Sequence, residues 1–186
     1  MPEPSSYLDV TLAELCQQLA TEAAPGGGSA AAVAATMAAA LTAKAAQRSE
    51  SWGEAPTVIA RVDFLGARCA ELAELDAQVF EEALAALETG VGVAAPLQRT
   101  TDVLLELAET AAEVAALAAR TAERGGAGFR GDAASAAVLA AAATLTAEAL
   151  VAVNLTVTDS DARLSTAHSL AEDAAASALR ALKAGP

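Results

Sequence analysis

Residues 29–48 read SAAAVAATMAAALTAKAAQR, and this stretch of the sequence decides the fold class. Alanine has the highest helix propensity of all residues and is a poor strand former, so the stretch predicts a helix. Between positions 29 and 47 its only charged residue is Lys44. A helix that is apolar nearly all round is expected at the centre of a bundle or in the interface of an oligomer.

The rest of the chain has the same character. Its 186 residues are 54% hydrophobic but only 3% aromatic, which favours an all-α protein with a core of small side chains. The length suits a single domain over residues 1–186. The 24 acidic residues outnumber the 11 Lys and Arg, and the net charge is −13. Because this charge repels phosphate backbones, nucleic acid is not an expected partner.

Glycine and proline residues divide the chain into helical segments. Thr11 and Glu14 form a capping-box pattern that starts a helix, and the turn at residues 25–29 ends it. The apolar patterns predict further helices over residues 56–88, 96–124 and 132–156, the last with Asp132 as N-cap, and a final helix between the polar cluster 158–161 and Gly185. Short connections favour antiparallel neighbours, so we expect an antiparallel bundle of five to six helices.

An alanine core also bears on assembly. Alanine side chains bury little apolar surface, so a monomer built mostly from them has little stability in reserve. We therefore expect a homodimer in which the Ala-rich helices 29–48 and 132–156 of two copies meet.

Metal chemistry is not expected. Cys16 and Cys69 lie far apart in apolar helical patterns, which is typical of buried, reduced thiols. His168 is the only histidine, and one histidine with two separated cysteines does not make a typical zinc site. The Glu-x-x-His pairs of metal-binding helix bundles are missing from the sequence. We predict neither a metal nor a bound cofactor.

Signals for export or membrane insertion are weak. Residues 1–9 have no basic segment followed by an apolar one, so no signal peptide is predicted and the protein is expected in the cytoplasm. Residues 132–157 are long enough to span a membrane, but they are mostly alanine and no basic cluster follows them. No membrane association is expected.

One candidate site is the turn formed by Pro25, Gly26, Gly27, Gly28 and Ser29. Glycines let backbone amides approach a ligand, and a helix N-terminus favours anions or electron-rich oxygens. The turn lacks the spacing and the lysine of a phosphate-binding loop. The alternative is a flexible turn that Ser29 caps.

A second candidate is Asp76 in the helix 56–88. The apolar positions of this helix follow alternating steps of four and three, and Asp76 occupies one of them. Burial of an unpaired carboxylate costs several kcal/mol, so a carboxylate in this place is a candidate general acid or base. The alternatives are a structural salt bridge and a helix rotated to expose it.

Three further side chains are weaker candidates. Asn154 lies on an apolar face and needs hydrogen-bond partners from the protein or from a heteroaromatic ligand. Asp132 is either a pocket residue or a plain N-cap. Lys44 either holds a ligand carboxylate or extends from the helix end into solvent.

Together these motifs resemble the cyclodeaminase/cyclohydrolase family. This family comprises the C-terminal half of formiminotransferase-cyclodeaminase and the stand-alone bacterial methenyltetrahydrofolate cyclohydrolases. The resemblance rests on the glycine turn before an Ala-rich helix and on the sequence DAQVF at residues 76–80. It continues with APL at 95–97, DAASAA at 132–137 and VNL at 153–155, in the same order. Lys44 and the sequence GFRG at 128–131 depart from the family pattern.

The resemblance implies a homodimer of all-α subunits with a folate derivative as substrate and no metal. It implies that Asp76 is the acid/base group and that the substrate is bound by Gly26, Gly27, Gly28, Ser29, Lys44, Phe80, Asp132 and Asn154. Because no transferase domain accompanies this sequence, we expect hydrolysis of 5,10-methenyltetrahydrofolate to 10-formyltetrahydrofolate. The alternatives are formiminotetrahydrofolate cyclodeamination, which releases ammonia, and a non-catalytic folate-binding or scaffold dimer.

Overall fold

Helices make up nearly all of the computed structural model, which describes residues 6–49, 51–155 and 161–184. The described residues contain no strand, and their helices are α1 (Leu12–Thr21), α2 (Gly27–Gln47), α3 (Ala55–Thr89), α4 (Ala94–Arg124), the short 3-10 helix η1 (Ala127–Phe129), α5 (Arg130–Asn154) and α6 (Ala162–Lys183). The predicted all-α helix bundle is confirmed.

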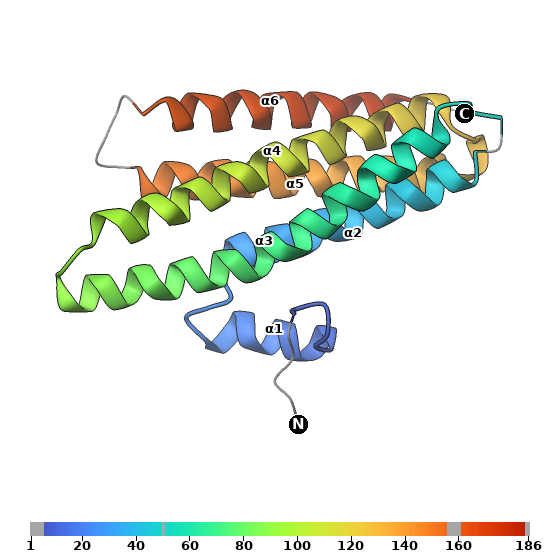
Figure 1. The fold of residues 1–186 in the computed structure, drawn as a ribbon. Coiled ribbons are helices and arrows are strands. Elements are labelled where there is room, and N and C mark those ends of the chain that lie inside the picture. The colour runs from blue at the N-terminus through green and yellow to red at the C-terminus, as the bar shows by residue number, and fades with distance from the viewer. Residues whose placement is uncertain (1–5, 50, 156–160, 185–186) are drawn as a thin grey trace.

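The five long helices α2–α6 lie alongside one another, and α1 lies apart from them next to α2 and α3 (Figure 1). Helix α5 packs against α2, α4 and α6, whereas α2 packs against α3, α4 and α5. Helix α4 contacts α2, α3, α5 and α6 and is therefore the most central helix, and the two Ala-rich helices pack against it and against each other. Because α2 and α5 run in opposite directions, the start of α2 lies near the end of α5 (Figure 1).

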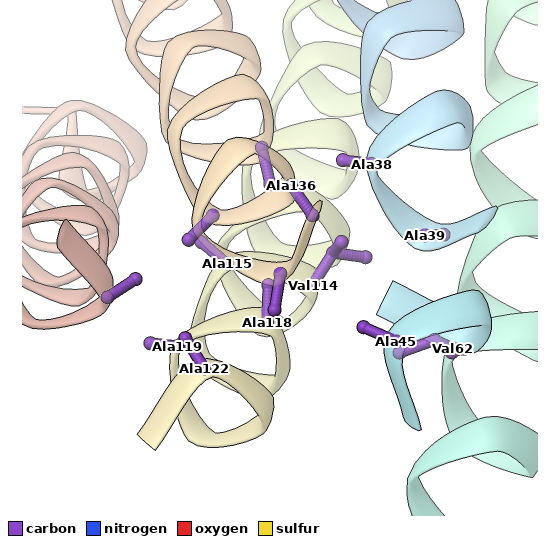
Figure 2. Packing of buried hydrophobic residues seen from close by; sticks show 14 of the residues in the cluster. Ala38, Ala39, Ala45, Val62, Val114, Ala115, Ala118, Ala119, Ala122 and Ala136 are labelled. Atoms are coloured by element: carbon purple, nitrogen blue, oxygen red, sulfur yellow. The ribbon is translucent and has the colours of Figure 1, made fainter. Parts of the chain in front are cut away.

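Alanine methyl groups fill most of the core. Figure 2 shows one cluster in which Ala38, Ala39 and Ala45 of α2 lie together with Val62 of α3 and with alanines of α4 and α5. Larger side chains such as Leu72 of α3 and Leu107 of α4 are fully buried elsewhere. Small side chains let helix axes approach closely, so these helices fit tightly without large residues between them.

Helix starts differ from the prediction at two places. Thr11 caps α1 through the predicted capping box with Glu14. Helix α2, however, begins at Gly27 with Gly26 as its N-cap, so Ser29 lies inside the first turn and does not cap it. The prediction of Asp132 as N-cap is also wrong, because η1 continues directly into α5 and Phe129 takes the N-cap position. Both side chains are thereby available for other contacts.

Helix α1 is less buried than its sequence predicts. Only Leu15 of its apolar face is buried, and Leu12 is 71% exposed. Cys16 is exposed, which contradicts the predicted buried thiol, whereas Cys69 of α3 is buried as expected. Burial raises the pKa of the Cys69 thiol to about 12. The difference arises because α1 lies outside the bundle.

One side of the bundle remains apolar and exposed. We call it the α2/α5 face, after the exposed side chains Met37 and Ala40 of α2 and Val138, Ala142, Leu145 and Val153 of α5. Both Gly27–Gln47 and Ala127–Asn154 are long and apolar enough to cross a membrane by length and composition. In the bundle they pack against each other, with 61% and 44% of the respective apolar windows buried.

Outside the described residues lie the predicted end of a helix at Thr156, most of the polar cluster at 158–161, and Gly185. The observed ends nearest to them are Asn154 for α5 and Asp161 as the N-cap of α6.

Candidate functional site

Asp76 is held in the bundle without a cation. It lies on α3 and is 8% exposed. The Ser29 hydroxyl of α2 donates a hydrogen bond of 2.9 Å to its Oδ2 atom. Among the described residues no Lys, Arg or His forms an ion pair with it. Burial raises the pKa of the Asp76 carboxyl group above 3.8, although hydrogen bonds from Ser29 oppose the rise.

A glycine makes this close approach of α2 and α3 possible. A Cβ atom placed on Gly28 would lie 2.5 Å from the carboxyl carbon of Asp76, far inside van der Waals contact. Any side chain at position 28 must therefore displace the carboxyl group. The glycine turn thus has a steric role that spacing in the sequence does not reveal. The carboxyl group of Asp76 also lies against the first turn of α2, where the helix dipole favours negative charge.

The carboxyl group borders a cavity of about 190 Å³ between four helices. Its wall is mostly apolar, and it is formed by Ala23, Gly26, Gly27, Gly28, Asp76, Phe80, Thr100, Leu104, Leu150 and Asn154. Among the residues that the structure describes, none with a cationic side chain belongs to this wall. The Nδ2 atom of Asn154 donates to Oγ1 of Thr100 over 3.2 Å, which leaves the amide oxygen of Asn154 for a ligand.

These contacts distinguish between the functional alternatives for Asp76. A structural salt bridge requires a cation beside the carboxyl group, and none of the described residues supplies one. A carboxyl group with a raised pKa at the wall of an apolar cavity is instead suited to donating or accepting a proton. Since Asp76 and Asn154 border the same cavity, the geometry favours a catalytic site over a scaffold.

Lys44 and Asp132 lie elsewhere. Their side chains form an ion pair with 2.7 Å between Nζ and Oδ2, and Lys44 also lies 5.8 Å from the ring centroid of Phe129. Sixteen residues of α2 separate Lys44 from Gly28, which corresponds to about 24 Å along the helix. The structure therefore brings together Gly26–Ser29, Asp76, Phe80 and Asn154, and it places Lys44 and Asp132 at the opposite end.

Sequence reasoning missed four residues of the cavity wall, namely Ala23, Thr100, Leu104 and Leu150. A signal for one of them was present, because Leu150 precedes Asn154 by four residues and so shares its helix face. Thr100 and Leu104 have the same spacing on α4, but nothing in the sequence pairs that face with Asp76.

A second polar cluster joins α5 to α6 at the surface. His168 Nδ1 lies 2.7 Å from Oε1 of Glu148, and its Nε2 atom lies 3.6 Å from Glu172. The bond to Glu148 and the charge of Glu172 raise the pKa of His168. Within the described part of the chain, no group of three or more His, Cys, Asp or Glu side chains is arranged to hold a metal ion.

Comparisons with known proteins agree with this fold. The model of the formiminotransferase-cyclodeaminase family matches residues 11–173. The crystal structure of formiminotetrahydrofolate cyclodeaminase from Thermotoga maritima superposes with a TM-score of 0.86. At 21% identity the alignment covers 94% of this chain and 95% of that one, so it demonstrates a shared fold. No curated protein sequence matches this chain significantly.

Proposed function

Because this chain belongs to the formiminotransferase-cyclodeaminase family of enzymes, we propose that it cyclises formiminotetrahydrofolate to 5,10-methenyltetrahydrofolate and releases ammonia. The observation that carries this proposal is the buried Asp76 carboxyl group at the wall of an apolar cavity, with Ser29 as its hydrogen-bond donor. The family match and the fold of the Thermotoga maritima cyclodeaminase favour this reaction over the hydrolysis expected from the sequence.

In the proposed reaction Asp76 is the general acid. N10 of the folate attacks the formimino carbon, a new N10–C bond forms, and the proton of N10 passes to the former imine nitrogen. Asp76 then donates a second proton to that nitrogen, the C–N bond breaks, and ammonia leaves. The raised pKa of Asp76 keeps a larger share of its carboxyl groups protonated for this step. Asp76 regains its proton from solvent.

Hydrolysis of 5,10-methenyltetrahydrofolate is the second candidate, and the same carboxyl group supports it. As a carboxylate, Asp76 takes a proton from a water that attacks the carbon between N5 and N10. Asp76 then returns this proton to N5 as the C–N5 bond breaks, the hydroxyl group on the carbon loses its proton to solvent, and the formyl group remains on N10. The hydrogen bonds from Ser29 favour this ionised form, so Ser29 is the feature that supports hydrolysis.

Each copy is proposed to work in a homodimer. The α2/α5 face exposes Met37, Val138, Leu145 and Val153 on two adjoining helices. From residue 27 to 43 and from 133 to 147 the two helices carry no charge. An uncharged apolar face of this length is typical of a permanent interface between subunits.

Two assays on the purified protein test the reaction. With formiminotetrahydrofolate, ammonia release and the absorbance of the methenyl product should rise together. With methenyltetrahydrofolate, loss of the same absorbance reports hydrolysis. Cyclodeamination is supported if the protein releases ammonia from formiminotetrahydrofolate and this activity requires Asp76. Hydrolysis is favoured if the protein consumes methenyltetrahydrofolate but releases no ammonia from formiminotetrahydrofolate. If neither substrate reacts and neither binds in calorimetry, the proposed function is wrong.

A further inference from the structure

We propose that the folate site is shared between two copies of the chain, with Lys44 and Arg48 of the partner subunit binding the glutamate carboxylates of the substrate. The proposal rests on the proposed folate reaction and names the residues that hold the substrate's tail. Its starting point is the separation of Lys44 from Asp76 by most of the length of α2.

The cavity is too small for a whole folate. Its volume of about 190 Å³ lies below the roughly 300–1,000 Å³ of sites that enclose drug-sized ligands. It suits the bicyclic pterin and the reacting atoms next to Asp76. The aminobenzoyl group and the glutamate must then extend beyond it. Gly27 and Phe80 are the exposed residues of α2 and α3 at the wall, so the tail leaves near the start of α2.

The charges near this exit do not suit a glutamate tail. A folate tail carries two carboxylates, which need cations. No cation belongs to the cavity wall, and Arg99 and Arg163 nearby on α4 and α6 are paired with Glu82 and with Asp102 and Asp161. Cations for the tail must therefore come from outside this end of the chain.

The opposite end of α2 offers suitable cations. Lys44 is half exposed and pairs with Asp132, much as Arg99 pairs with Glu82, so the feature that distinguishes this end is Arg48. Arg48 has no carboxylate partner among the described residues and lies 5.7 Å from the ring of Phe129. The ring of Phe129 is partly buried against the core, and a partly exposed aromatic ring with two cations beside it is suited to a ligand that combines an aromatic group with carboxylates.

A two-fold axis brings the two ends together. Met37 lies at the middle of α2 and Ala142 at the middle of α5, and both are exposed on the α2/α5 face. A two-fold axis that runs perpendicular to the two helices and passes over these residues places α2 of one copy antiparallel to α2 of the other. Lys44 follows Met37 by seven residues and Ala30 precedes it by seven, so the partner's Lys44 lies opposite Ala30, one turn from Gly27.

Charge selects this arrangement over a parallel one. An axis along the helices places Lys44 and Arg48 of both copies at the same end, where like charges oppose association. The antiparallel arrangement instead places those cations next to the start of α2 and the end of α5 of the other copy. In that part of α5, between positions 143 and 154, Glu148 is the only charged residue.

Mixed dimers test the shared site. Lys44→Ala should raise KM for methenyltetrahydrofolate or formiminotetrahydrofolate by about 10-fold or more, the worth of a hydrogen bond to a charged group, with little change in kcat. A substrate truncated before the glutamate should lose this difference. The matched control is Lys183→Ala, which removes the only other lysine, on α6, and leaves KM unchanged.

Asp76→Asn and Lys44→Ala dimers are then mixed and allowed to exchange subunits. If the site is shared, each mixed dimer contains one site with both Asp76 and the partner's Lys44. At low substrate concentration, activity should recover to about a quarter of wild type, since half of the dimers are mixed and half of their sites are intact. Activity that stays at the sum of the two variants overturns the proposal.

A cross-link tests the arrangement without activity. In a Cys16→Ser background, Ala30→Cys and Lys44→Cys chains should form disulfide-linked dimers only when mixed. Linked dimers from Lys44→Cys alone indicate parallel pairing and overturn the proposal. If the mixed cross-link forms and folate binds but neither folate substrate turns over, the proposed reaction is wrong while the shared binding site stands.

Discussion

At the scale of single residues, Asp76 connects stability with chemistry. Its carboxyl group is buried, and within the described part of the chain Ser29 is the only side chain that donates a hydrogen bond to it. Asp76→Asn keeps the size and one hydrogen bond but removes the acid. Turnover should fall by about 10²–10⁴, and the melting temperature should stay level or rise because a buried charge is removed. Kinetics and thermal unfolding of one variant measure both. A lower melting temperature with a near-normal rate identifies a structural role.

The stability of this variant relative to wild type should also depend on pH. The pKa of Asp76 is raised in the folded protein above its ordinary value of 3.8, so the folded state binds this proton more tightly than the unfolded state. Wild-type stability therefore falls as pH rises from 3.8 through the raised pKa. Asp76→Asn does not lose stability in this way. The free energy of unfolding of the variant minus that of wild type should therefore increase from pH 3.8 to the raised pKa and be constant at higher pH.

Gly28 sets the distance between α2 and Asp76. Gly28→Ala places a Cβ atom where the carboxyl group lies, so we expect a large loss of activity and a lower melting temperature. The control is Gly131→Ala, which occupies the same position in the first turn of α5 but has open space around it. That change should stabilise the protein by up to about 1 kcal/mol. Equal effects of the two changes contradict the steric role of Gly28.

At the scale of helices, close packing depends on alanine. Ala35 of α2 is fully buried, whereas Ala67 of α3 is exposed. Ala35→Leu should lower the free energy of unfolding by about 1–3 kcal/mol or more, because the inserted atoms push α2 away from its neighbours. Ala67→Leu should change it by less than about 0.5 kcal/mol. Chemical denaturation measures both, and similar values would contradict tight packing of α2.

The helices themselves were predictable because local signals set them. Alanine runs, capping residues and glycine turns act within a few residues, and they placed the helices to within a few positions. The burial of Asp76 was also predictable, because it interrupts an apolar stripe. Cys16 was misjudged because α1 lies outside the bundle, where only Leu15 of its apolar stripe is buried.

The assembly of the site was less predictable. Periodicity assigns a residue to a face of its own helix, but it does not say which end of another helix lies against that face. Asn154 lies near Gly27, and Asp132 pairs with Lys44, because α5 runs antiparallel to α2. That placement depends on contacts between residues more than 80 positions apart, which no local pattern encodes.

At the scale of the whole molecule, the α2/α5 face is the surface through which we propose that two copies associate. Ala38 and Ala39 point into the core of one chain (Figure 2), whereas Met37 is 49% exposed. Met37→Glu should therefore dissociate the proposed dimer and preserve helicity, as light scattering and circular dichroism measure. Leu179→Glu, at an exposed position of α6, should leave the dimer intact. If the wild-type protein is monomeric and binds lipid vesicles, the α2/α5 face binds a membrane and not a second copy of the chain.

The alanine core also shapes the response of the protein to temperature. Heat capacity on unfolding increases with exposed apolar area and decreases with exposed polar area. A methyl group exposes little apolar area, yet each helical residue still exposes its full peptide group. Calorimetry should therefore give a heat-capacity change per residue below the roughly 12–15 cal/mol/K of ordinary proteins. The curve of stability against temperature should accordingly be broad and shallow, with gradual loss of stability on both cooling and heating.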